Sequence, residues 1–165
     1  MQLVQRASDR LTFGRGGFQI RRVLPGLCLQ NANDPGFGPL GAFDHAHLQP
    51  GVVVAMHQHR NDEIFSYVRT GTMLHEDTSG GRLPLTPTHF AVMNAGSGMW
   101  HEERVPDDAE PVEMLQIFVR PREDELPPEF QHREFPHLES RNIWFLQATK
   151  LCCRPFDLRK TCCLR

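Results

Sequence analysis

The sequence predicts an all-β domain of the sandwich or barrel type with little helix. Many short runs rich in β-branched and aromatic residues are separated at close intervals by turn-forming residues. No long stretch repeats apolar residues every 3.6 positions, so helices should be rare. The chain has 165 residues, of which 39% are hydrophobic and 23% charged. This length and composition suit one globular domain with a core of its own.

The predicted strands follow one another through residues 18–120, the expected body of the domain. Each is a run of apolar or β-branched residues that ends at a turn signal such as Pro25-Gly26. The expected strands cover 18–24, 41–48, 52–56, 63–68, 72–76, 82–85, 89–93 and 112–119.

The segments outside this body differ from it in composition. Residues 1–17 are rich in glycine towards their end and are expected to form a flexible lead-in. Residues 121–149 are expected to form a polar connector, over 121–136, and one final strand near 142–148. Residues 150–165 form an atypical cysteine-rich tail with neither alternation nor turn signals.

Charge and hydropathy exclude several classes of function. A net charge of −2 leaves no broad basic surface to neutralise phosphates, so direct nucleic-acid binding is not expected. No apolar run approaches the ~20 residues that span a bilayer, so no membrane role is expected. The first six residues lack the apolar core of a signal peptide, and the cytoplasm is the expected location.

The five cysteines do not form a disulfide framework spread through the chain. Cys28 stands alone, and Cys152, Cys153, Cys162 and Cys163 lie close together in the tail. Four cysteines could form a zinc knuckle, but neighbouring side chains diverge where C-x2-C loops converge. The sequence therefore favours a poorly ordered tail over a zinc site.

Two short stretches carry residues that could bind a metal. His57 and His59 end a β-branched run, and His101 and Glu103 follow a glycine-rich turn. Residues two apart in a strand point to the same face, so each pair presents both side chains together. Three imidazoles and one carboxylate make a plausible site for a divalent transition metal.

Other histidines among the nine give weaker pairs with the same spacing. His45 with His47, and His75 with Asp77, could also share a face. The pair His57/His59 is preferred because it ends a hydrophobic strand and lies between Gly51 and Gly71. Glycine before His101 would let the backbone pack closely there.

These residues resemble the cupin superfamily and, within it, the pirin family. Gly51, His57, His59, Glu63 and Gly71 match the first cupin motif, with one extra residue before the last glycine. Residues 93–103, Met-Asn-Ala-Gly-Ser-Gly-Met-Trp-His-Glu-Glu, fit the pirin pattern Met-x-Ala-Gly-x-Gly-x-x-His-x-Glu. The family's Pro-His-Pro-His-Arg-Gly is here Met-His-Gln-His-Arg-Asn, residues 56–61.

The resemblance implies a single cupin-type β-barrel, a jelly-roll-like double-stranded β-helix, with a metal inside. Carried over residue by residue, the ligands would be His57, His59, His101 and Glu103. Glu63 would have a supporting or structural role. One divalent transition metal per chain is expected, with iron(II) first and zinc, manganese, nickel or copper as alternatives.

The resemblance also implies a function: a metal-dependent dioxygenase of the quercetin 2,3-dioxygenase type, acting on a small aromatic substrate. Glu103 would be its catalytic base. The alternatives are a non-catalytic, metal-dependent regulatory or interaction protein, and a truncated form of a pirin with two cupin domains. In the last case, the surface left by the absent second cupin domain would favour self-association.

Overall fold

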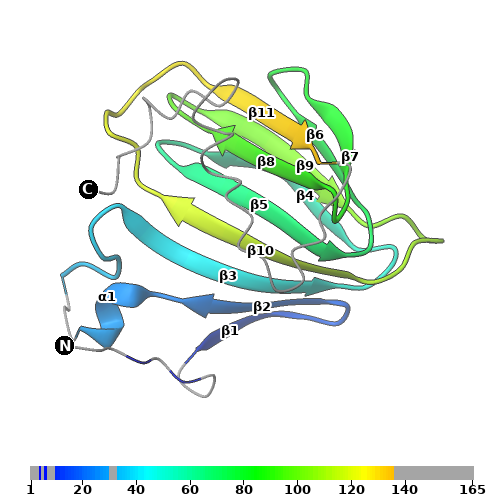
Figure 1. The fold of residues 1–165 in the computed structure, drawn as a ribbon, viewed down its shortest axis with the longest axis horizontal. Helices are drawn as coiled ribbons and strands as arrows, with labels where there is room; N and C mark the ends of the chain where they lie inside the picture. Colours follow the sequence, from blue (N-terminus) through cyan, green and yellow to red (C-terminus); the bar gives the residue numbers. More distant parts are fainter. Residues whose placement is uncertain (1–3, 5, 7–9, 30–32, 136–165) are drawn as a thin grey trace.

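Two antiparallel sheets form a double-layered β-barrel (Figure 1). In this computed structural model, the structure describes residues 10–29 and 33–135, together with residues 4 and 6. The strands of the larger sheet, in chain order, are β1 Leu11–Arg15, β2 Phe18–Val23, β3 Leu40–Leu48, β5 Glu63–Thr70, β8 His89–Asn94, β10 Val112–Val119 and β11 Glu129–Glu134. Those of the smaller sheet are β4 Val53–His59, β6 Met73–Asp77, β7 Arg82–Leu85 and β9 Met99–Arg104.

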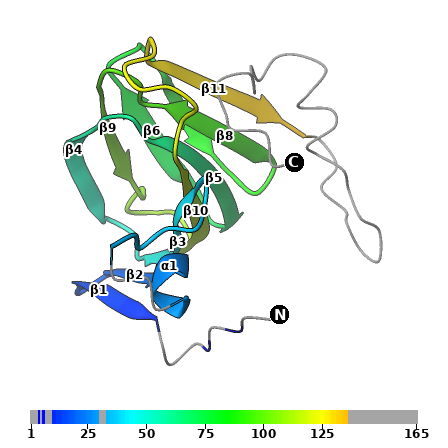
Figure 2. The same ribbon diagram turned by 90° about the vertical axis from the view of Figure 1, so that its left-hand side faces the viewer.

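The seven strands of the larger sheet run in the order β1-β2-β3-β10-β5-β8-β11, and the four of the smaller in the order β4-β9-β6-β7. Figure 2 shows β4, β9 and β6 in one wall and β3, β10, β5 and β8 in the other. Every named pairing is antiparallel, as expected where one sheet face packs on a core and the other is solvated. The predicted all-β barrel is confirmed.

The core fills the space between the two sheets. Leu48 and Met114 from the larger sheet pack in one cluster with Met73 and Leu85 from the smaller, each at most 2% exposed. Strand β3 shows the underlying alternation, because Ala46 and Leu48 are buried while the intervening residues are partly exposed. Full burial of a large apolar side chain stabilises the fold by about 2 kcal/mol, so the clustered residues fix the relative position of the sheets.

The two ends of the domain contain strands where the sequence indicated none. Residues 11–15, expected in a flexible lead-in, form β1 and pair with β2 as a hairpin. Glu129–Glu134, expected in a surface connector, form β11 and pair with β8. Both are edge strands without a fully buried residue, so their sequences carry little of the apolar alternation that identifies a strand.

One short helix, α1 at Pro25–Cys28, follows β2 where the sequence indicated only a stop. Among the described residues, no helix has the length and apolar character needed to cross a membrane. The final strand expected at 142–148 and the cysteine-rich tail at 150–165 lie outside the described residues.

Candidate metal centre

The candidate site is built on the inner face of the smaller sheet, where β4, β9 and β6 lie side by side. His57 on β4 faces His101 on β9 directly in the antiparallel register. On the other side of β9, His75 of β6 faces Glu103. The pairing of adjacent strands therefore brings together side chains that are far apart in the sequence.

A β-bulge in β4 sets the direction of His57. Val54 pairs with Glu103 and His57 pairs with His101, so three steps along β4 correspond to two along β9. Strict alternation would turn residues three apart to opposite faces, whereas Val54 and His57 both line the same cavity. The extra residue re-aims the strand, which is a common role of bulges beside functional sites.

Glycine before β9 lets its first residues approach β4. Gly98 has a φ of +143°, and a Cβ there would lie 2.7 Å from the side-chain amide nitrogen of Gln58. A larger residue would be strained at this φ, and the Gln58 side chain would have to move aside. This glycine therefore allows the backbone turn that leads into β9 and so towards His101.

Three imidazoles converge between the strands. His57, His59 and His101 each offer a ligand atom within 4.8 Å of the other two. The Nε2 atoms of His57 and His101 are 3.1 Å apart. The three ring centroids lie 4.4 to 5.2 Å from one another.

The outer nitrogens of the β4 histidines are anchored, which turns the inner nitrogens towards the site. His57 Nδ1 lies 2.9 Å from the carbonyl oxygen of Ala55, and His59 Nδ1 lies 3.1 Å from the carboxylate of Asp62. Carbonyl and carboxylate oxygens accept hydrogen bonds, so each Nδ1 donates and each Nε2 keeps a free lone pair. Such an orienting partner is typical of histidines that bind metals.

His101 is the buried member of the cluster. Burial lowers the pKa of its imidazole to about 2, and the repulsion of His57, His75 and His59 adds to this effect. Its Nδ1 is buried without a hydrogen-bond partner among the described residues. A neutral imidazole is the form that binds a metal, so the chemistry of this donor set fits a divalent transition metal.

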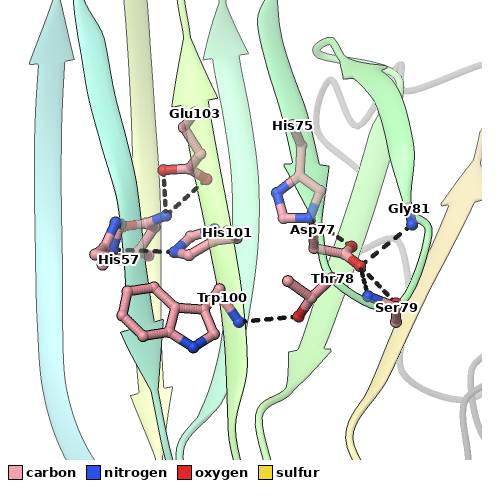
Figure 3. Close-up of polar contacts among 10 residues, drawn as sticks. His57, His75, Asp77, Thr78, Ser79, Gly81, Trp100, His101 and Glu103 are labelled. Atoms are coloured by element: carbon pink, nitrogen blue, oxygen red, sulfur yellow. Dashed lines mark hydrogen bonds and ion pairs between the residues drawn. The ribbon is translucent and has the colours of Figure 1, made fainter.

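Glu103 is also buried and lies on the same face of β9 as His101 (Figure 3). Its carboxylate oxygens accept hydrogen bonds of 3.1 and 3.2 Å from the side-chain amide of Gln116, on β10 of the opposite sheet. Burial raises the pKa of Glu103 to about 7, although Gln116 and His59 act in the opposite direction. One possible ligand atom each from Glu103, His101 and His75 lies within 4.8 Å of the other two. The two β4 histidines form a separate group of this kind with His101.

His75 and Asp77 form a buried pair beside this site. His75 Nε2 lies 2.9 Å from the Asp77 carboxylate, and its ring stacks on Phe130 at 4.2 Å. Burial lowers the pKa of His75 and outweighs the opposing hydrogen bond to Asp77. Burial alone would raise the pKa of Asp77, but hydrogen bonds, chiefly from Ser79 and His75, leave it below its usual value. The pair is therefore a neutral imidazole that donates to an ionised carboxylate.

A cavity of about 270 Å³ opens between the sheets at these residues. His57, His59, His101 and Glu103 line one side, and Ile20, Leu48, Met114 and Phe118 supply apolar surface. Arg22 and Asp44 also line it and form a two-fold hydrogen-bonded ion pair at 2.7 and 2.6 Å. The cavity thus combines an apolar wall with a few convergent polar groups, as small-molecule sites do.

The residues singled out from the sequence differ in their surroundings. His57, His59, His101 and Glu103 all line the one cavity, and their role as ligands stays a prediction. Glu63 is 2% exposed and Met99 is fully buried, whereas Trp100 faces outwards and is 45% exposed.

Sequence reasoning missed Gln116 and Asp62, which position Glu103 and His59. For Gln116, the sequence did contain one sign of an inward-facing polar residue. It is the polar residue in the alternating series Val112, Met114, Gln116, Phe118, whose other members are apolar. For Asp62, the sequence contained no sign of a role apart from its position three residues after His59.

The fold and this site define the chain as a cupin-type β-barrel with a candidate histidine-rich metal centre between its sheets. A family model described as Pirin matches residues 18–119, which is more than half of the 165 residues. The chain therefore belongs to the pirin family.

Related proteins agree with this assignment. The chain is 29% identical over 116 residues to a quercetin 2,3-dioxygenase of Escherichia coli K12, a match that covers 68% of this chain and 50% of the relative. A putative quercetin 2,3-dioxygenase of Pasteurella multocida is 32% identical over 88 residues, or 53% of this chain and 38% of that one. The chain thus spans about half the length, or less, of these curated relatives.

Solved structures show the same fold. The crystal structure of YhhW from Escherichia coli superposes with a TM-score of 0.71 at 27% identity, covering 81% of this chain and 57% of that one. The bacterial pirin YhhW in complex with nickel(II) gives a TM-score of 0.68 at 28% identity, with 79% and 56% covered. These relatives suggest a bound metal in this family.

Proposed function

We propose that this chain is a mononuclear metal-dependent dioxygenase of the quercetin 2,3-dioxygenase type. The observation that carries the proposal is the convergence of His57, His59 and His101 at a cavity that also contains the carboxylate of Glu103. The quercetin 2,3-dioxygenase named among the relatives supports the reaction class. The nickel(II) complex of a relative supports the use of a metal.

The residues that would hold the metal are His57, His59, His101 and Glu103. Imidazole nitrogens with one carboxylate suit iron(II), which is our first choice, and also zinc, manganese, nickel and copper. The bound metal would supply Lewis acidity and redox chemistry at the cavity wall. Anchoring of His57 and His59 through Nδ1 holds two of the ligands ready without rearrangement.

Glu103 is the residue that would take a proton from the substrate. It is 5% exposed, lies at the cavity and is held by a neutral amide rather than by a cation. A carboxylate in such surroundings accepts a proton more readily than an exposed one, because burial disfavours its charge. Glu103 would have to loosen from the metal to act as this base, so it would serve two roles.

The cavity favours a small aromatic substrate. Its volume of about 270 Å³ is slightly below the roughly 300 Å³ at which typical small-molecule sites begin, so the substrate must be small. Phe118 and Met114 would pack against an aromatic ring while its hydroxyl oxygen turned towards the histidines. A flavonol, or another enolisable aromatic compound, meets these requirements.

Oxygen uptake with quercetin tests this proposal. Protein loaded in turn with iron, copper, nickel or manganese should consume oxygen slowly, and metal-free protein should not. Glu103→Gln should lose far more rate than bound metal. Glu102→Gln is the matched control. Glu102 precedes Glu103 on β9, and its side chain lies on the opposite face of the strand, where it contacts Arg104. No oxygen uptake with any of the four metals would reject the dioxygenase.

A non-catalytic, metal-dependent interaction protein is the second candidate. It is favoured by exposed apolar residues on the smaller sheet: Val53 (54% exposed), Met56 (42%), Leu74 (37%) and Trp100 (45%). An apolar group of this kind suits contact with another protein surface. In this case metal would bind without oxygen uptake, and its removal would alter association.

A further inference from the structure

A second cluster of metal-binding residue types lies on the opposite side of the larger sheet from the cavity. On β3, Asp44 and Ala46 point inwards, so His45 and His47 point outwards. Glu113 of β10 lies directly opposite His47 in the register. We propose that His45, His47 and Glu113, here called the outer cluster, form a second divalent-metal site.

The three side chains are already close enough to share an ion. Each offers a ligand atom within 4.8 Å of the other two. His45 Nε2 lies 2.9 Å from Glu113 Oε1, and the two imidazole centroids are 4.5 Å apart. Bonds of about 2.1 Å in a tetrahedral arrangement place ligand atoms roughly 3.4 Å apart. The His45 and Glu113 atoms, 2.9 Å apart, would therefore have to separate slightly to admit the ion.

The backbone beneath the outer cluster is rigid. β3 is a central strand, bonded to β2 on one side and to β10 on the other. His45 and His47 are two residues apart on one strand, and the carboxylate comes from the adjacent strand. The side chains of His45 and Glu113 are 23% and 21% exposed, so they are partly desolvated and remain accessible to an ion. Burial also lowers the pKa of His47, with a further contribution from His45.

Arg69 limits the affinity of this site. Its Nη1 donates to both oxygens of Glu113 at 2.9 Å, and it would compete with a cation for the carboxylate. The Arg69 side chain is 66% exposed and can turn into solvent when an ion binds. The outer cluster should therefore bind more weakly than the barrel site, with water completing the coordination.

Two imidazoles and one carboxylate select zinc(II), nickel(II) or copper(II) over magnesium or calcium, which prefer oxygen ligands. Nothing in the sequence pointed to Glu113 as a partner for His45 and His47, because it lies 68 positions after His45 and meets them only in the sheet. The inference does not rest on the proposed dioxygenase, since the outer cluster shares no residue with the cavity.

Titration of the metal-free, full-length protein with zinc(II) tests the proposal. Isothermal titration calorimetry should give two sites per chain, one tight and one weaker. His45→Asn/His47→Asn should remove the weaker site and keep the tight one. His57→Ala/His59→Ala should do the reverse. If that last variant fails to fold, the loss of one site in His45→Asn/His47→Asn still decides the matter.

Arg69→Gln provides a second and more selective measurement. Removing a positive charge next to the bound ion should tighten the weaker site by about fivefold and leave the tight site unchanged. Arg133→Gln, on distant β11, is the matched control and should change neither affinity. A wild-type protein with a single site that survives His45→Asn/His47→Asn would overturn the proposal. So would a weaker site that survives His45→Asn/His47→Asn or is not tightened by Arg69→Gln.

Discussion

The Nε2 atoms of His57 and His101 face one another at 3.1 Å across the β4–β9 pair. Because His57 Nδ1 donates to a carbonyl, His57 Nε2 can only accept, and His101 Nε2 must donate when no ion is bound. That leaves His101 Nδ1 as a buried acceptor without a partner among the described residues. If a cation bound to both Nε2 atoms, His101 would have to release its proton from Nε2 and carry it on Nδ1 instead.

Metal content should therefore depend on this pair. His57→Ala or His101→Ala should lose most of the tightly held metal, because either change removes an anchored or buried ligand. Elemental analysis after extensive dialysis measures this. Gln58→Ala, on the same strand between His57 and His59, is the control and should keep its metal. Full metal content in a His57→Ala/His59→Ala protein would refute the site.

Gln116→Leu should make metal binding more sensitive to acid. The amide of Gln116 donates to both oxygens of Glu103 and favours its ionised form. Without this donor the pKa of Glu103 should rise above about 7, and the metal must displace a more tightly held proton. Nickel(II) affinity measured from pH 6 to 8 should show a midpoint moved to higher pH. An unchanged midpoint would mean that Glu103 is not a ligand.

Among the groups that link the stability of the metal-free protein to pH, His101 and Glu103 act in opposite directions. His101 has a folded pKa of about 2 against an ordinary 6.5, so the unfolded chain gains a proton below pH 6.5 and stability falls there. Glu103 has a folded pKa of about 7 against 4.5, so the folded chain holds an extra proton between these values and stability rises as the pH falls through them. The two effects should nearly cancel between pH 4.5 and 6.5.

Urea unfolding of metal-free wild type and Glu103→Gln across this range would test the cancellation. The variant cannot take up the compensating proton. Relative to wild type, it should therefore lose about 1.4 kcal/mol of stability for each pH unit between 6.5 and 4.5. Parallel curves for the two proteins would contradict the assigned pKa of Glu103.

Arg22→Ala should destabilise the barrel. Asp44 is 1% exposed and is paired with Arg22 by two hydrogen bonds, so removing the arginine leaves a buried charge unpaired. The expected cost is about 3 kcal/mol of the free energy of unfolding. Arg21→Ala is the control, because Arg21 lies on the exposed face of β2, and it should cost less than about 0.5 kcal/mol. Equal losses for the two variants would show that the ion pair does not matter.

Trp100→Lys should reduce self-association. Trp100 is 45% exposed on β9, with Met56 on β4 and Leu74 on β6 also exposed. If this apolar face pairs with a second copy of the chain, a charge at Trp100 would oppose the contact. Sedimentation velocity at several concentrations would measure the change. A protein that is monomeric at all concentrations before mutation would rule out this role.

Local patterns in the sequence were enough to identify the strands with a buried face. β10 was predicted with its observed bounds, Val112–Val119, because its apolar residues and flanking turns are both strong signals. β1 and β11 were missed because edge strands without a fully buried face need no such pattern. The pairs His57/His59 and His101/Glu103 followed from two-residue spacing, which fixes a shared face, together with the hydrophobic run and the glycines around them.

The tertiary structure decided how those pairs meet. Only the β4–β9 register sets His57 against His101, and only a bulge in β4 turns His57 and Val54 to the same cavity. Gln116 reaches Glu103 from the opposite sheet, and Glu113 reaches His45 from the neighbouring strand. The sequence determined which face each side chain takes on its own strand, because alternation is a local property of the backbone. Which strands lie together is set by packing and hydrogen bonding across the whole barrel, and this non-local choice brings the two residue pairs to one cavity.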